Sequence, residues 1–192
     1  MKAGTILREF EARDGRKVTL RTPTWGDLDD MLKFINSLVE EEAMILMDVK
    51  QTREQEVDWL ARALSNMEKD RHVRVVAEVD GRMVGQCEVT LGSGRKSHVG
   101  TLGISVKWGY REVGIGQGLM REAERHAARL GLEKIKLEVF ATNDRPSTST
   151  RRWGTGSSDA SRGRSSTKES TLTPSTWSRM FAHPSFIPPT SQ

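Results

Sequence analysis

Hydrophobic residues recur along this chain with two periods, and the dominant period changes near Arg71. Before that point, the sequence KVTLR at 17–21 alternates polar and apolar residues, which predicts a half-buried strand. Two stretches with apolar residues every three or four positions follow and predict amphipathic helices. We expect the first helix to begin at Thr24 or Asp27. We expect the second to begin at Thr52, where a glutamine three residues later completes a capping-box pattern.

In the second half of the chain, strand patterns enclose a single helix. The runs HVRVVAEV and RMVGQCEVTLG flank the dipeptide Asp80-Gly81, which is typical of a β-hairpin with a two-residue turn. A nearly continuous apolar run at 98–106 predicts a central strand, followed by a helix at 116–130 and a strand at 135–139. Because a helix that joins two such strands is typical of parallel pairing, the pattern predicts an α/β fold with a mixed sheet.

The regular pattern ends at Arg145. Residues 146–192 are rich in Ser, Thr and Arg and have neither period, so we expect a disordered tail after a core of residues 1–145. The core holds 24 basic and 24 acidic residues, whereas the tail holds six and two and supplies the whole net charge of +4. A basic surface for nucleic acid is therefore absent from the core, and we expect no nucleic-acid partner.

Other residue types narrow the class of protein further. Cys87 is the only cysteine, which excludes an internal disulfide and a cysteine-based zinc site. His72, His98 and His126 lack the spacing of metal ligands, so we expect no metal. Charged residues begin at Lys2, and no apolar run is long enough to span a bilayer. We therefore expect a cytoplasmic protein without membrane contact.

A glycine-rich turn joins the predicted central strand to the following helix. Glycines at a helix N-terminus let the backbone approach an anion, and the N–H groups there favour a phosphate. The dinucleotide fingerprint G-x-G-x-x-G fits poorly, because Leu119 stands where its third glycine belongs. A Walker loop is also excluded, since Gly94-Arg-Lys-Ser contains an extra arginine and no helical pattern follows it.

The run Arg111-x-x-Gly114-x-Gly116, after the strand GTLGISV and before GLMREAERHAARLGLEKIKLEVFATN, resembles the acyl-CoA signature of the GNAT superfamily of N-acyltransferases. This resemblance implies a central mixed sheet flanked by helices, with the coenzyme A-binding half at 98–145. It implies acetyl-CoA as the cosubstrate and an amine as the acceptor, either a protein N-terminus or a small molecule.

The resemblance also implies which residues hold the coenzyme. Backbone amides of the glycine turn would bind the pyrophosphate, and Arg111 would lie at its border. The end of the preceding strand would bind pantetheine, with the Val106 N–H directed at the thioester carbonyl. The expected coenzyme-binding residues are Ile104, Ser105, Val106, Arg111, Glu112, Val113, Gly114, Ile115, Gly116, Gln117, Gly118 and Asn143.

Acetyl transfer to an amine needs a base, because an amine of pKa near 10 is mostly protonated at neutral pH. Glu138 matches the glutamate that serves as the base in the branch of the superfamily that acetylates protein N-termini, which shares L-E-V-x-x-x-N. Glu88, on the hairpin strand, is the second candidate. The tyrosine that protonates the leaving thiolate in the family would fall at Thr150, and the only tyrosine is Tyr110, within the coenzyme turn.

The family's C-terminal helix and strands are thus missing or replaced after Arg145. Codons for A-I-H-L-Y-E-K-V-G read P-S-T-S-T-R-R-W when their first base is dropped, and this is the sequence from Pro146 to Trp153. Our hypothesis is a frameshift; a natural disordered tail fits the composition equally well. The expected activity is an acetyl-CoA-dependent N-acetyltransferase, impaired by the lost tyrosine. The alternative is a non-catalytic acyl-CoA-binding module, and an incomplete sheet edge leaves a homodimer open.

Overall fold

A computed structural model gives the fold of residues 1–43, 47–140 and 167–172. Within these residues, seven strands form one sheet in chain order. Every neighbouring pair is antiparallel except β5 and β6, which are parallel, so the predicted mixed sheet is confirmed. The strands are β1 (Ile6–Glu11), β2 (Lys17–Arg21), β3 (His72–Val79), β4 (Arg82–Leu91), β5 (Val99–Val106), β6 (Lys134–Phe140) and β7 (Thr167–Leu172).

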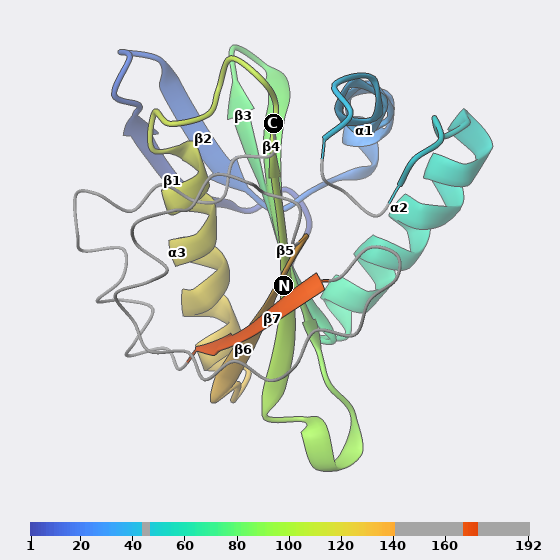
Figure 1. Ribbon diagram of the computed structural model, residues 1–192, viewed down its shortest axis with the longest axis vertical. Coiled ribbons are helices and arrows are strands. Elements are labelled where there is room, and N and C mark those ends of the chain that lie inside the picture. Colours follow the sequence, from blue (N-terminus) through green and yellow to red (C-terminus); the bar gives the residue numbers. More distant parts are fainter. Residues whose placement is uncertain (44–46, 141–166, 173–192) are drawn as a thin grey trace.

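Helices cover both faces of the sheet (Figure 1). On one face lie α1 (Leu28–Glu40), which follows the short 3-10 helix η1 (Trp25–Asp27), and α2 (Arg53–Glu68). On the other face lies α3 (Ile115–Arg129), and a second 3-10 helix, η2 (Gly94–Lys96), joins β4 to β5. None of the helices in the described part of the chain could span a bilayer.

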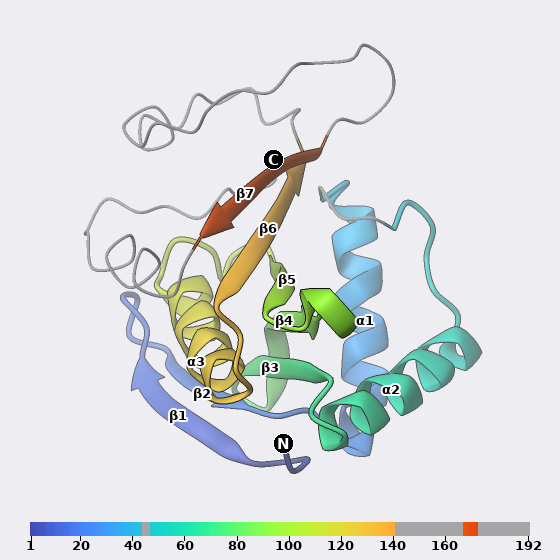
Figure 2. The same cartoon turned by 90° about the horizontal axis from the view of Figure 1, so that it is seen from below.

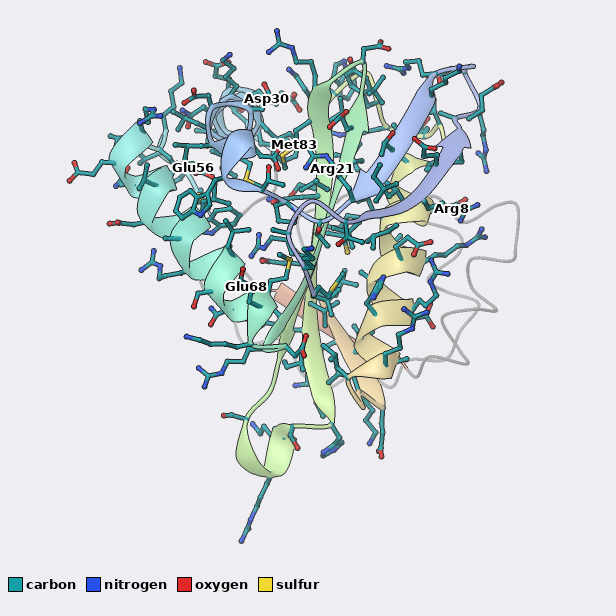
Figure 3. The ribbon with its side chains drawn as sticks, turned by 180° about the vertical axis from the view of Figure 1, so that it is seen from behind. Arg8, Arg21, Asp30, Glu56, Glu68 and Met83 are labelled. Atoms are coloured by element: carbon teal, nitrogen blue, oxygen red, sulfur yellow. The ribbon has the colours of Figure 1, made fainter. Side chains whose placement is uncertain are left out.

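Each face of the sheet has its own hydrophobic cluster. The larger cluster lies between α3 and strands β2 to β6, and includes Leu20, Leu102 and Leu119. The smaller cluster joins α1 and α2 and takes only Val76 and Met83 from the sheet. Asp30 of α1 also accepts a hydrogen bond from the Met83 N–H at 3.1 Å, where α1 meets β4 (Figure 3). The contact of α1 and α2 with the sheet is therefore concentrated near the β3–β4 turn.

Local signals in the sequence are confirmed where they are strongest. Thr52 caps α2, accepting a hydrogen bond from the Gln55 N–H at 3.3 Å while the Gln55 side chain accepts one from the Thr52 N–H at 2.8 Å. Asp80 and Gly81 form the hairpin turn with φ angles of 50° and 71°. Asp27, one of the two residues predicted to begin the first helix, is the N-cap residue of α1.

Two strands of the sheet were not predicted from the sequence. β1 pairs with β2 at one edge, and β7 pairs with β6 from Ile135↔Leu172 to Phe140↔Thr167 at the other. The second of these strands lies within the segment for which no element was expected, while the rest of 146–192 lies outside the described residues. The expected helix at 116–130 is observed one residue earlier, as α3.

A β-bulge interrupts the pairing of β3 with β4. Ala77 pairs with Gly85 whereas Glu78 pairs with Met83, so Val84 is an extra residue on β4. Val84 and Gly85 both lie toward α3, because Val84 belongs to the larger cluster and a Cβ on Gly85 would lie 3.1 Å from Leu119 Cδ1. Beyond this bulge the even-numbered residues of β4 face α1 and α2.

Candidate active site

Strands β5 and β6 separate halfway along their length. They pair only from Val99↔Lys134 to Leu102↔Leu137, after which β5 continues beside β4 and β6 continues beside β7. Figure 2 shows β6 and β7 as a pair that diverges from β4 and β5. Within the described strands, the last four residues of β5 therefore have a neighbour on one edge only.

The hydrogen-bond alternation shows which backbone groups face this gap. The Lys107 N–H donates to the Val84 carbonyl at 2.9 Å, so Lys107 and, two residues earlier, Ser105 direct their backbone groups at β4. Ile104 and Val106 must then direct theirs at the gap. Of the three residues expected to bind pantetheine through the backbone, two have this orientation and Ser105 does not.

The glycine turn ends in a left-handed residue at the start of α3. Gly114 is the N-cap, with φ of +99°. A residue with a side chain avoids this conformation, and a Cβ on Gly114 would have no atom within 4 Å, so the position borders open space. The Gly118 N–H bonds to the Gly114 carbonyl at 3.0 Å, which is the first i→i−4 hydrogen bond of α3.

Gly118 is required for packing. A Cβ there would lie 3.0 Å from a ring carbon of Phe10 and 3.3 Å from Leu20 Cδ1, so its absence lets α3 lie close against β1 and β2. The N–H of Gly118 is already bonded within the helix, which differs from its expected place among the pyrophosphate donors. The loop before α3 is also fixed, because the Arg13 N–H donates to the Val113 carbonyl at 2.9 Å.

Arg111 connects three parts of the site. Its Nε donates to the Val106 carbonyl at 2.7 Å, and its Nη2 donates to Glu41 Oε2 at 2.8 Å. Glu41 Oε1 also accepts a hydrogen bond from the Trp108 N–H at 3.3 Å, and the guanidinium lies over the Trp108 ring. The end of β5, the glycine turn and the C-terminal end of α1 are thus held together.

The role of Glu41 was missed in the sequence. It belongs to an acidic run of three glutamates, Glu40 to Glu42, at the end of α1. Carboxylates at a helix C-terminus are unfavourable next to the negative end of the helix dipole. Their presence there was the available signal that one of them has a cationic partner elsewhere, which proves to be Arg111.

The face of β3 to β5 below α2 is polar, unlike the face below α3. The strand register determines which residues lie on this face: Arg74 pairs with Glu88, and Glu88 pairs with Gly103. The Cγ and Oε1 atoms of Glu88 lie 3.6 Å from where a Cβ of Gly103 would be, so Glu88 lies over the point where β5 leaves β6. The polar residues of these strands that face α1 and α2 are His72, Arg74, Glu78, Gln86, Glu88, Thr90, Thr101 and Ser105.

The remaining predicted residues lie apart from this face or outside the described part. Glu138 is the first residue of β6 beyond the pairing with β5, and it pairs with Glu169 of β7. Asn143 and Thr150 lie outside the described residues. The Arg16 guanidinium lies over the Tyr110 ring, with its central carbon 4.2 Å from the ring centre. In the described part of the chain, no group of three or more His, Cys, Asp or Glu residues could hold a metal ion.

The sequence profile of the acetyltransferase (GNAT) family matches residues 35–147, more than half of the chain. The chain belongs to the GNAT acetyltransferase family. The family and the mixed-sheet fold are thus those that the resemblance in the sequence predicted. No curated protein matches this GNAT chain in sequence.

Solved structures of other GNAT proteins share the fold at low sequence identity. The GNAT domain of S. lividans PAT superposes with a TM-score of 0.63 at 13% identity, covering 86% of this chain and 96% of that one. The structure of yncA from Salmonella typhimurium with its cofactor acetyl-CoA gives 0.63 at 16% identity, covering 82% and 94%. A ribosomal-protein-alanine N-acetyltransferase from Brucella melitensis gives 0.57 at 24% identity, covering 69% and 80%.

Proposed function

We propose that this protein transfers the acetyl group of acetyl-CoA to a primary amine. The observation that carries the proposal is the separation of β5 from β6 after Leu102, directly upstream of a helix that begins at a glycine in open space. Such a gap exposes backbone groups that can pair with an extended amide-bearing chain. The helix start beyond it offers N–H groups to a diphosphate.

The coenzyme is expected to lie along this gap. Pantetheine amides would bond to the backbone of Ile104 and Val106, and the pyrophosphate would bond to the amides from Val113 to Gln117. The Val106 N–H would donate to the thioester oxygen, where negative charge grows during attack. Arg111 fixes this geometry through the Val106 carbonyl, and its charge adds to the attraction for the phosphates.

The acceptor is expected on the polar face below α2. In the reaction, the amine nitrogen bonds to the acetyl carbon, the carbon–sulfur bond breaks, and coenzyme A leaves as a thiolate that takes up a proton. Glu88 is the better placed of the two candidate bases, because its carboxylate lies over Gly103 at the start of the gap. Glu138 remains the second candidate, because its backbone lies in β6, on the other side of the gap between β5 and β6.

The test is a thiol-release assay with acetyl-CoA and a panel of N-terminal peptides and small amines. We expect Glu88→Gln to lower the turnover number at least tenfold while the acetyl-CoA Kd stays within twofold. Glu133→Gln is the matched control. Glu133 is exposed and precedes Lys134, where the pairing of β6 with β5 begins, whereas the gap opens at the other end of that pairing. A larger loss in Glu138→Gln than in Glu88→Gln would transfer the role of the base to Glu138.

Two results would contradict the proposal. Absence of both binding heat and thiol release with acetyl-CoA would refute coenzyme binding itself. Binding heat without thiol release for any amine would identify a non-catalytic acyl-CoA-binding module instead. Because Thr150 replaces the family's tyrosine, we expect clear binding and slow turnover in this chain.

A further inference from the structure

A buried arginine lies next to the proposed base. The side chain of Arg74, on β3, is 4% exposed and forms an ion pair with Glu88, whose side chain is 37% exposed. The Arg74 guanidinium lies over the Trp59 ring of α2, 4.3 Å from its centre. Glu56, also on α2 (Figure 3), is a buried carboxyl group nearby.

This burial is unfavourable for stability alone. Removing a guanidinium from water costs several kcal/mol, and one ion pair often does not recover that cost. Within the described residues, Arg74 Nε and Nη1 have no hydrogen-bond partner. Burial lowers the pKa of Arg74, although Glu88 and Glu56 oppose that effect. Arg74 is not a member of the apolar cluster of α1 and α2, so the packing of that cluster does not account for a charge at this position.

The surroundings of Arg74 disfavour a direct role in binding an anionic acceptor. Its Nε and Nη1 atoms are inaccessible, and Trp59 covers the guanidinium. Two carboxyl groups, Glu56 and Glu88, already flank this single positive group, so the cluster has no surplus positive charge. Only Glu88 connects Arg74 to the partly exposed surface at the strand gap.

We propose that Arg74 is a positioning residue, which holds the Glu88 carboxylate over Gly103 for proton transfer from the acceptor amine. Trp59 fixes the guanidinium from the α2 side by stacking. The proposal deepens the proposed function and rests on it. The fork of a guanidinium suits this task, because its planar geometry restricts the orientation of the carboxylate it binds.

Replacing Arg74 also changes the surroundings of other titratable groups near Glu88. These are His72 on β3 and Glu56 on α2, whereas β5 contributes no titratable side chain. Burial and the charge of Arg74 lower the pKa of His72, and burial raises the pKa of Glu56. Arg74→Lys keeps the positive charge and therefore controls for both effects.

The experiment compares Arg74→Met, Arg74→Lys and Arg82→Met, in which the last removes an exposed arginine from β4 as a control. For Arg74→Met we expect at least a tenfold lower turnover number, with the acetyl-CoA Kd and the KM for the amine both within twofold. Arg74→Lys should restore only part of the turnover number, because lysine keeps the positive charge but lacks the planar fork.

Several results would overturn the proposal. One is an Arg74→Met protein with a raised KM for the amine but an unchanged turnover number, since that indicates acceptor binding by Arg74. Another is an Arg74→Lys protein that is no more active than Arg74→Met. If Arg74→Met does not fold, Trp59→Leu removes only the stacking, and an unchanged turnover number in that variant would count against the proposal.

The failure of this proposal is distinct from failure of the proposed function. A wild-type protein that transfers no acetyl group, or a Glu88→Gln variant with full activity, refutes the function or its base. In that case, crystal structures of the wild type and of Arg74→Met still test whether Arg74 holds the Glu88 carboxylate over Gly103. An impaired Glu88→Gln beside an unimpaired Arg74→Met refutes the positioning role alone.

Discussion

Replacing Gly114 by alanine separates the cost of backbone strain from the cost of blocking a phosphate. Gly114 has φ of +99°, so any side chain there is strained by about 1–2 kcal/mol. Gly131, at the end of α3, offers a matched control, because it has φ of +84° and its Cβ would also have no atom within 4 Å. Both substitutions should therefore lower the free energy of unfolding by a similar amount.

Only Gly114→Ala should also weaken coenzyme binding. Its new methyl group would stand in the open space before the α3 N-terminus, where the diphosphate is proposed to lie. Overpacking by one methyl group costs about 1–3 kcal/mol, which corresponds to about a 5- to 150-fold higher Kd. For Gly131→Ala, at the far end of the helix, the Kd should stay within twofold.

Isothermal titration calorimetry with acetyl-CoA and denaturant unfolding of the same samples measure both quantities. A Kd for Gly114→Ala within twofold of the wild-type value would refute the placement of the diphosphate at this helix end. A Gly131→Ala protein that binds as weakly as Gly114→Ala would show that general strain, rather than local blocking, lowers the affinity.

Three further predictions concern stability and reactivity. Thr52→Ala should lower the free energy of unfolding by about 1 kcal/mol, because it removes the hydroxyl that accepts the hydrogen bond from the Gln55 N–H; an unchanged unfolding midpoint would contradict this. Burial raises the pKa of the Cys87 thiol, so Ellman's reagent should label Cys87 only as the protein unfolds, and rapid labelling of the native protein would be the opposite result. Burial alone would raise the pKa of Asp27, but hydrogen bonds from Arg21 and Thr24 outweigh it and hold that pKa below the ordinary 3.8. This stabilisation is present above pH 3.8 and is lost as the pH falls through the lowered native value. Asp27→Asn should therefore be less stable at pH 7 and should lose less stability on acidification than the wild type, as measured by thermal unfolding across pH.

Local sequence signals predicted the elements that depend on neighbouring residues. The Thr52 capping box and the Asp80-Gly81 turn each involve residues no more than three positions apart, so both can be recognised from the sequence alone. The two edge strands were missed because their pairing depends on distant partners. β1 is mostly exposed, and TKESTL of β7 is polar with no apolar alternation.

The candidate site was predictable on its backbone side only. The glycine turn and Arg111 follow one another in sequence, and the structure places them together at the start of α3. Glu41 is 70 residues from Arg111, so no local pattern could connect them. The pairing of Arg74 with Glu88 depends on the exact register of the hairpin, which a turn dipeptide does not determine.

The single extra residue in β4, Val84, decides which side of the sheet carries the chemistry. A two-residue turn with uninterrupted pairing from Val79↔Arg82 would place Cys87 opposite Arg74 and turn Glu88 toward the apolar cluster under α3. Deleting Val84 would remove the bulge and still leave Glu88 opposite Arg74, because the residues beyond it keep their partners. A residue inserted between the bulge and Glu88 would instead place Glu88 opposite Val73 and turn it toward the apolar cluster under α3, so the orientation of the proposed base is encoded in the length of this strand.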